Sequence, residues 1–196
     1  MTTSPGTAKQ GWTWQRIARR VRVPLGFVFA AVYMWLARPT AASLLWSLLL
    51  VAPGVWLRAY ASGYVRKNAE LATTGPYAHT RNPLYLGSML IAFGFAAASR
   101  SLVVLIVLAA LFFLIYLPVI RSEEQYLREH FEGFDAYAAR VPRLLPRLLP
   151  ARNGATAGSF SRALYLQHRE YNALMGAAAI YAALAVRMFL KMRGFR

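Results

Sequence analysis

A polar, proline-containing stretch, GPYAHTRNPLYLGSML at residues 75–90, leads directly into an apolar segment. Asn82 is a good helix-capping residue and Pro83 suits the first helical position, so a helix is expected to begin here. The first N–H groups of a helix lack intrahelical partners and carry a partial positive charge. With Arg81 beside them they would form a receptor for a carboxylate or a phosphate. An ordinary cap with a snorkelling arginine accounts for the same residues about equally well.

Two of the seven acidic residues, Glu123 and Glu124, are adjacent and follow directly after an apolar run. Acidic residues favour the start of a helix, but the apolar helix is expected to continue through Arg121, so no helix start explains them. A cationic ligand would explain them. Because adjacent helical residues face different directions, both contact one ligand only if it wraps around the helix. Otherwise one of the two glutamates has a structural role.

The arginine-flanked helix start and the glutamate pair together suit a ligand that carries both a carboxylate and cationic groups. S-adenosylmethionine (SAM) is such a ligand, with an α-amino acid, a sulfonium and an adenosine. The rings of Tyr77 and Tyr85 would pack against its adenine or its sulfonium.

Charge-free windows predict the elements that position these residues. The chain has 196 residues, of which 58% are hydrophobic and only 15% charged, whereas soluble domains carry about a quarter charged residues. A helix needs about 20 apolar residues to cross a bilayer, and lipid-embedded backbone must satisfy its own hydrogen bonds. We therefore expect an all-α, polytopic membrane helix bundle with about five transmembrane helices. The windows are 23–37, 39–57, 82–99, 101–120 and a weaker one at about 171–190, which either crosses or lies partly at the interface.

The basic residues predict the orientation of these helices. They concentrate in the N-terminal arm, between the second and third windows and after the fourth, and only Arg38 and Arg100 fall on the other side. The positive-inside rule places the N-terminus and both long polar segments in the cytoplasm. The 59–82 loop and the 121–170 segment then share one face, so a cytoplasmic cofactor site is expected. The basic tail would lie outside if the fifth helix crosses.

The formal net charge of +16 is compatible with nucleic acid, but the basic residues cluster at the ends of apolar runs, which favours lipid headgroups as partners. The chain has no cysteine and three histidines without metal-ligand spacing, so no metal site is expected. The N-terminus lacks a signal-peptide cleavage pattern and is interpreted as retained. The tandem RLLPRLLP at 143–150 predicts an extended or turn-rich surface segment, because proline resists helix continuation, and 151–159 reads as a flexible linker.

The motif GPYAHTRNPLYLG, followed by an apolar run, EEQYL and FDAYAARVPRLLP, resembles the isoprenylcysteine carboxyl methyltransferase and phospholipid methyltransferase family of integral membrane enzymes. The family pattern is close to G-P-Y-x-x-x-R-[HN]-P-x-Y-x-G, then E-E-x-x-L, then Y-x-x-Y-x-x-x-V-P, and the resemblance covers about residues 70 to 150. It implies SAM binding by a set of residues along both motifs: Gly75, Pro76, Tyr77, Arg81, Asn82, Tyr85, Gly87, Glu123 and Glu124. His79 joins this set as a substitute for the histidine that many members have at the position of Asn82. Phe134 stands at a usual tyrosine position, one residue early.

We therefore expect a SAM-dependent methyltransferase that acts on a lipophilic acceptor in a prokaryotic inner membrane. The expected chemistry is in-line methyl transfer, with positioning and exclusion of water rather than a protein nucleophile. Arg121 and Arg143 are candidates to hold an acidic acceptor group. The resemblance favours carboxyl O-methylation of an isoprenylcysteine-like acceptor, with N-methylation of an ethanolamine phospholipid as the alternative, and a non-enzymatic basic membrane protein stands as an alternative of another class. The expected organisation is a basic arm (1–22), a helical hairpin (23–58), a cofactor-binding core (59–150) and a linker with a C-terminal helix (151–196).

Overall fold

A computed structural model describes residues 28–66, 69–151 and 158–194. The described residues form helices and loops without any strand, which confirms the predicted all-helical class. Residues 28–36 are helical and belong to a first unit that ends at Leu36. The second unit, Ala37–Arg196, contains the remaining elements. The expected basic arm at 1–22 lies outside the described residues, as does most of the predicted linker.

Three helices in the described part of the chain are long and apolar enough to cross a membrane. They are α2 (Ala41–Ser62), a continuous helix over Leu102–His130, and α8 (Tyr171–Met192). The apolar helix α3 (Pro83–Ser99) is shorter. The chain therefore has the helices of an integral membrane protein, and the number of crossings beyond these three stays a prediction. The remaining helices are short: η1 (Gly75–Ala78), α6 (Phe134–Arg140) and α7 (Arg162–Gln167).

The helix over Leu102–His130 consists of α4 (Leu102–Leu111), a wider π turn η2 (Phe112–Tyr116) and α5 (Leu117–His130). The π turn ends two residues before Pro118, whose missing N–H removes one rung of the usual hydrogen-bond ladder. The helix runs through Arg121, as the sequence predicts, so the glutamate pair lies in its interior rather than at its start.

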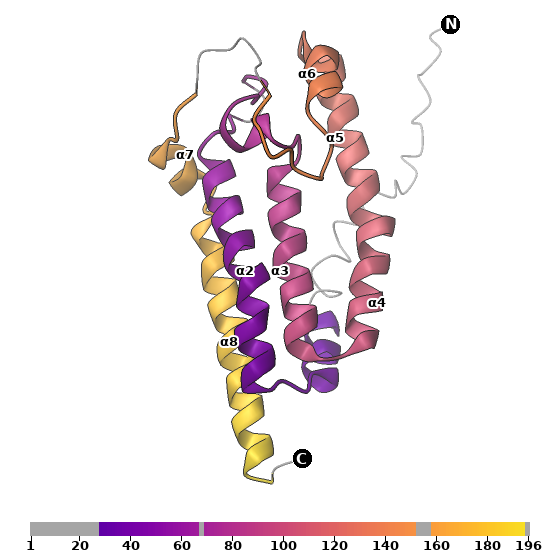
Figure 1. Ribbon diagram of the computed structural model, residues 1–196, viewed down its shortest axis with the longest axis vertical. Coiled ribbons are helices and arrows are strands. Elements are labelled where there is room, and N and C mark those ends of the chain that lie inside the picture. Colours follow the sequence, from indigo (N-terminus) through magenta and orange to yellow (C-terminus); the bar gives the residue numbers. More distant parts are fainter. Residues whose placement is uncertain (1–27, 67–68, 152–157, 195–196) are drawn as a thin grey trace, which may run out of the picture. The chain divides into compact units, whose positions relative to one another are not determined.

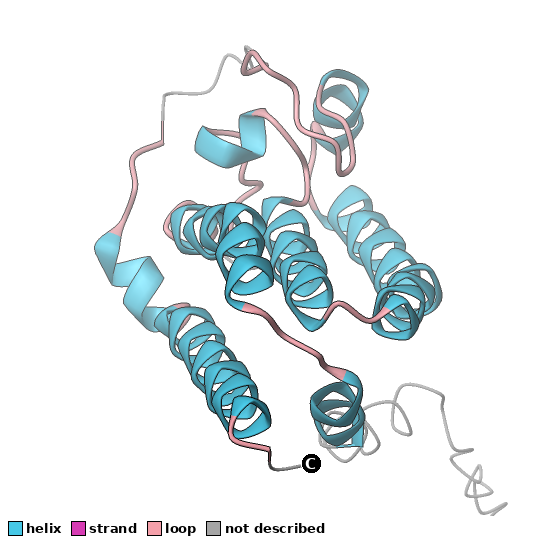
Figure 2. Cartoon of the chain, turned by 60° about the horizontal axis from the view of Figure 1, so that its bottom comes forward, coloured by secondary structure: helices cyan, strands magenta, loops and turns pink. Residues whose placement is uncertain are grey.

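The long helices of the second unit lie side by side (Figures 1 and 2). α3 lies between α2 and the α4–α5 helix, and α8 lies on the other side of α2. The α2–α3 contact is close because two glycines face each other: a Cβ atom on Gly87 would come within 2.8 Å of the Gly54 carbonyl oxygen. Small residues that let backbones approach are typical of helix pairs in membranes.

Arg58 joins three helices at one end of this bundle. Its guanidinium bonds to both carboxylate oxygens of Glu170, the residue before α8, at 2.9 and 3.0 Å. It also donates to the Leu84 carbonyl and to the Ser88 hydroxyl of α3. This end of the bundle carries the loop after α2, the start of α3 and the end of α5 (Figure 1), so the two predicted motifs meet there.

Candidate active site

The start of α3 coincides with the predicted helix start. Asn82 occupies the N-cap position and Pro83 the first turn, but the Asn82 side chain makes no capping hydrogen bond. The expectation of an asparagine side-chain cap is therefore corrected. The amide nitrogen Nδ2 instead donates to Glu124 Oε1 at 3.1 Å and to the Arg143 carbonyl at 2.9 Å. The residue is only 8% exposed, so its amide is committed to these two partners.

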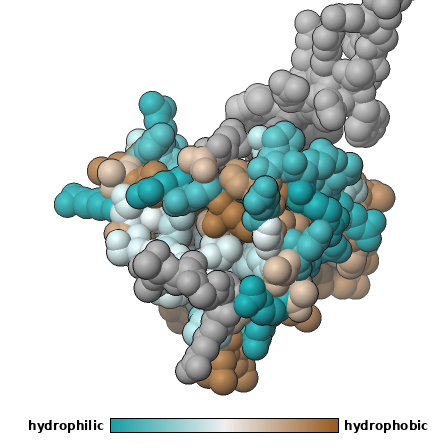
Figure 3. Space-filling view, turned by 90° about the horizontal axis from the view of Figure 1, so that it is seen from above, coloured by the Kyte–Doolittle hydropathy of each residue, from teal (hydrophilic) through white to brown (hydrophobic). Residues whose placement is uncertain are grey.

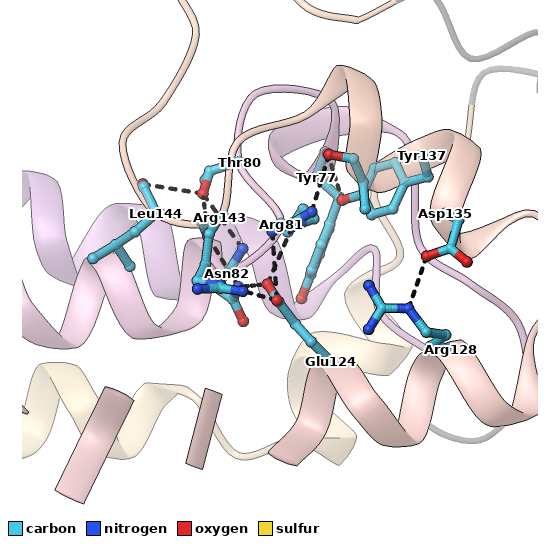
Figure 4. A network of polar contacts seen from close by, with 11 residues as sticks. Tyr77, Thr80, Arg81, Asn82, Glu124, Arg128, Asp135, Tyr137, Arg143 and Leu144 are labelled. Atoms are coloured by element: carbon cyan, nitrogen blue, oxygen red, sulfur yellow. Dashed lines mark hydrogen bonds and ion pairs between the residues drawn. The ribbon is translucent and has the colours of Figure 1, made fainter. Parts of the chain in front are cut away.

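Glu124 lies at the centre of a polar network between α5, the start of α3 and the 141–151 segment (Figure 4). The residue is 5% exposed. Its Oε2 accepts from Arg143 Nε at 2.9 Å and from Arg81 Nη2 at 3.4 Å, and Oε1 accepts from Asn82. A buried carboxylate needs paired charges and hydrogen bonds to offset its lost hydration. The protein's own cations supply these, so the burial of Glu124 does not require a cationic ligand.

Arg81 is held by both of its ends. Its backbone N–H donates to the Pro142 carbonyl at 2.9 Å, and its Nη1 donates to the Ala138 carbonyl at 3.0 Å. Its Nε lies 3.1 Å from Glu124 Oε1, which is ion-pair distance, yet this buried N–H has no aligned acceptor. The guanidinium is thus fixed at the base of the site, with its Nε buried against Glu124.

Glu123 has a different environment from its neighbour, as expected for adjacent positions on a helix. Its side chain is exposed, and Oε1 accepts a 2.8 Å hydrogen bond from the Tyr85 hydroxyl on α3. The Tyr85 ring packs edge-on against Tyr116, with centroids 5.9 Å apart. The glutamate pair is therefore divided into a buried, charge-paired Glu124 and an accessible Glu123.

The GPYA segment forms the short helix η1. Gly75 has a φ of +57°, and a Cβ atom there would lie 2.5 Å from the Tyr64 ring, so this position requires glycine. Tyr77 is buried, and its carbonyl accepts a 2.8 Å hydrogen bond from the Tyr137 hydroxyl of α6. Burial raises the pKa of both the Tyr77 and the Tyr137 hydroxyl. Both phenols are therefore neutral at physiological pH.

These elements enclose a cavity of about 270 Å³, close to the lower end of small-molecule sites, which start at roughly 300 Å³. Apolar and aromatic side chains make up much of its wall, and hydrophilic side chains surround this end of the molecule (Figure 3). Six of the residues predicted from the sequence line the cavity: Tyr77, Arg81, Asn82, Tyr85, Glu123 and Glu124. Other walls come from the loop after α2 and from the end of α5 and α6, including Leu71, Tyr126, Leu127, Phe134 and Tyr137.

The other predicted site residues lie elsewhere. Gly75 and Pro76 shape the turn that positions Tyr77. Gly87 packs against α2, so its missing side chain serves the helix pair and not an approaching ligand. His79 Nδ1 pairs with the Arg147 carbonyl at 2.7 Å, which gives this histidine a partner in the 141–151 segment. Arg143 supports Glu124, whereas Arg121 is exposed on α5 outside the cavity.

Comparison with known proteins identifies the family to which this chain belongs. The profile of the phospholipid methyltransferase family matches residues 25–133. The chain belongs to this family. The match includes both the Arg81–Asn82 helix start and the Glu123–Glu124 pair, and it supports the resemblance inferred from the motifs. No solved structure matches the chain.

Two curated proteins are similar in sequence to this member of the phospholipid methyltransferase family. The nickel-cobalt-cadmium resistance protein NccN of Alcaligenes xylosoxydans xylosoxydans is 42% identical over 114 residues, which is 56% of this chain and 53% of NccN. The cobalt-zinc-cadmium resistance protein CzcN of Cupriavidus metallidurans is 43% identical over 102 residues, 52% of this chain and 46% of CzcN. The chain thus spans about half the length of these relatives.

The family match stops just before α6, and the structure adds site residues from beyond it. Tyr137 bonds to Tyr77, and the buried Thr80 hydroxyl donates to the Arg143 and Leu144 carbonyls at 3.2 and 3.0 Å. Neither residue has a role that the sequence pattern predicts. The motif FDAYAARVPRLLP indicated that the segment after α5 belongs to the site. The residues that this segment contacts lie about sixty positions earlier in the chain, so local sequence pattern could not predict the pairs.

Proposed function

We propose that this protein is a membrane methyltransferase that uses SAM and transfers its methyl group to a lipophilic acceptor. The observation that carries the proposal is the cavity at the start of α3, where an accessible glutamate, a fixed arginine and several aromatic rings converge. The family membership supports the reaction class. The polar residues fit SAM: Glu123 suits its ammonium group, and the guanidinium of Arg81, which lines the cavity, suits its carboxylate. The tyrosine rings that line the cavity suit its adenine and its sulfonium.

SAM, when bound, supplies an electrophilic methyl group to an acceptor, and the protein's residues supply position. Glu124 holds Arg81 and Asn82 in place, so the start of α3 and helix α5 keep a fixed separation. Tyr77 and Tyr137 present neutral phenols and an apolar wall, which limits water near the reacting groups. A carboxylate acceptor needs no general base. An amine acceptor must first lose its proton.

The acceptor is proposed to be a lipid-like molecule with either a carboxylate or an amine as the methylated group. The motif favours the carboxyl O-methylation expected from the sequence, and the family profile carries the name of phospholipid methylation. Analysis of the methylated product, described below, distinguishes carboxyl O-methylation from N-methylation. We further propose that any contribution to metal resistance, as the names of NccN and CzcN suggest, comes from methylation of such an acceptor. In the described part of the chain, no three His, Asp or Glu side chains gather as a metal-binding group.

The test is incubation of the purified protein, reconstituted in vesicles, with methyl-labelled SAM and lipid extracted from the host membrane. We expect label in the lipid phase. Label released by mild alkali identifies a methyl ester, and alkali-stable label on a headgroup identifies N-methylation. Folded protein that transfers no label to any lipid fraction, and that SAM does not stabilise against heat, would favour a non-enzymatic membrane protein instead.

A further inference from the structure

The RLLPRLLP segment exposes its leucines next to the site, and the proposed reaction gives them no task. Three of these side chains are almost fully accessible: Leu145 is 78%, Leu148 97% and Leu149 76% exposed. Soluble surfaces expose single apolar residues commonly, but a cluster of this kind marks a partner or a membrane. The segment is not a helix, so the cluster is not a face of a membrane-crossing element.

The segment has a fixed position despite its irregular backbone. Arg147 N–H donates to the His79 carbonyl and Ala151 N–H to the Ala78 carbonyl, each at 2.9 Å. The Thr80 hydroxyl donates hydrogen bonds to the carbonyls of Arg143 and Leu144. The tandem is thus attached at both ends to the loop that precedes α3, and its leucines are held in one place.

That loop sits at the level where the apolar helices end. Gly87 of α3 contacts Gly54 of α2, and Arg58 reaches the Leu84 carbonyl. The first turn of α3 therefore lies beside the last turns of α2, a candidate membrane span that ends at Ser62. A bilayer crossed by α2 would therefore place residues 78–82, and the tandem attached to them, just beyond its hydrocarbon boundary.

The composition of the tandem suits this depth. Arg143 and Arg147 each precede a pair of leucines and are exposed, and arginines at this level attract anionic headgroups while leucines enter the acyl boundary. Irregular backbone is costly in lipid because its N–H groups need acceptors. Pro142, Pro146 and Pro150 have no N–H, and Arg147 has its own acceptor, so this cost is reduced.

We propose that residues 143–150 form an interfacial anchor that inserts Leu145, Leu148 and Leu149 into a bilayer rich in anionic lipid. The anchor holds the Arg143 side of the Glu124 network at the membrane surface. This inference does not depend on SAM binding or on methyl transfer, since it concerns only where the segment lies.

Site-directed spin labelling tests the proposal, because the chain has no cysteine and single-cysteine variants need no background removal. The labelled variants are Leu148→Cys, an aqueous control Ala136→Cys on the exposed face of α6, and a bilayer control Leu114→Cys in the π turn. Each is reconstituted in vesicles of phosphatidylcholine and phosphatidylglycerol in equal parts. Collision of the label with a water-soluble nickel chelate and with oxygen reports its depth.

We predict that the label at 148 loses most of the nickel accessibility of the 136 label and gains oxygen accessibility towards that of the 114 label. Labels at 145 and 149 should behave like the one at 148, which guards against a local effect of one substitution. Vesicles without phosphatidylglycerol should leave the label shallower; equal depth in both lipids would overturn the role given to the arginines. A 148 label as accessible to nickel as the 136 label in mixed vesicles would overturn the anchor and leave these leucines to a protein partner.

Discussion

The side-chain amide of Asn82 donates a 3.1 Å hydrogen bond to Glu124 Oε1 and a 2.9 Å hydrogen bond to the carbonyl of Arg143. One buried amide thus joins the start of α3, helix α5 and the segment after α6. Asparagine suits this task because its NH₂ group offers two donors, whereas a carboxylate would offer none.

Asn82→Asp should lower the free energy of unfolding by about 3 kcal/mol at neutral pH, because it removes both donors and places a second carboxylate against Glu124. Two adjacent carboxylates raise the pKa of one of them in the folded state. The loss should therefore shrink as the pH falls, since protonation restores a donor. Thermal unfolding in detergent at two pH values measures this. Asn82→Ala is the control: its loss, about 1–3 kcal/mol, should show no such recovery.

Glu124→Gln and Glu123→Gln should separate stability from ligand binding. Removing one charge of a buried, paired group costs about 3 kcal/mol, so Glu124→Gln should lower the melting temperature clearly. Glu123 is exposed and its single hydrogen bond to Tyr85 contributes little, so Glu123→Gln should melt close to the wild-type protein. The increase in melting temperature on adding SAM should nevertheless be smaller in Glu123→Gln. Two variants with the same melting temperature and the same response to SAM would contradict the division between the glutamates.

Gly87→Ala should destabilise the α2–α3 pair by roughly 1–3 kcal/mol, the usual range for overpacking. The new Cβ would lie 2.8 Å from the Gly54 carbonyl oxygen and 2.7 Å from Arg58 Cγ, and the backbone oxygen cannot move aside without shifting α2. Gly176→Ala is the matched control, because a Cβ there meets nothing within 4 Å. It should leave stability unchanged or raise it by up to about 1 kcal/mol. Equal effects of the two changes on thermal unfolding would argue against the close helix contact.

Tyr77 and Tyr137 should make the fold sensitive to alkali. Burial raises the pKa of both hydroxyls in the folded state, so the unfolded chain releases these protons first. Their contribution to stability is complete below the ordinary tyrosine pKa of about 10 and is lost as the pH rises towards the raised folded values. The double variant Tyr77→Phe/Tyr137→Phe should show a shallower decline in unfolding free energy above about pH 10. A decline as steep as that of the wild-type protein would show that these phenols do not titrate with unfolding.

The sequence predicts the helices of this protein well because hydrophobic windows are local properties. Runs between Arg38 and Arg58 and between Arg100 and Arg121 correspond to α2 and to the first part of the Leu102–His130 helix. The helix start at Pro83 was equally predictable, since asparagine followed by proline is a local signal.

The partners within the site were less predictable because they are set by packing. The amide of Asn82 points to Glu124 instead of capping its helix, and Gly87 serves α2 instead of a ligand. The contacts of Arg81 with Ala138 and Pro142, and of Arg58 with Glu170, join residues about 57 to 112 positions apart. Sequence pattern indicates that such side chains need a partner, but only the arrangement of the helices determines which one.

Equilibrium binding of labelled SAM to the purified protein in detergent is the most direct test of the proposed cofactor site. We predict saturable binding that the demethylated product competes for, with weaker affinity in Glu123→Gln and unchanged affinity in Gly176→Ala. A folded wild-type protein that shows no saturable binding at millimolar SAM would contradict it.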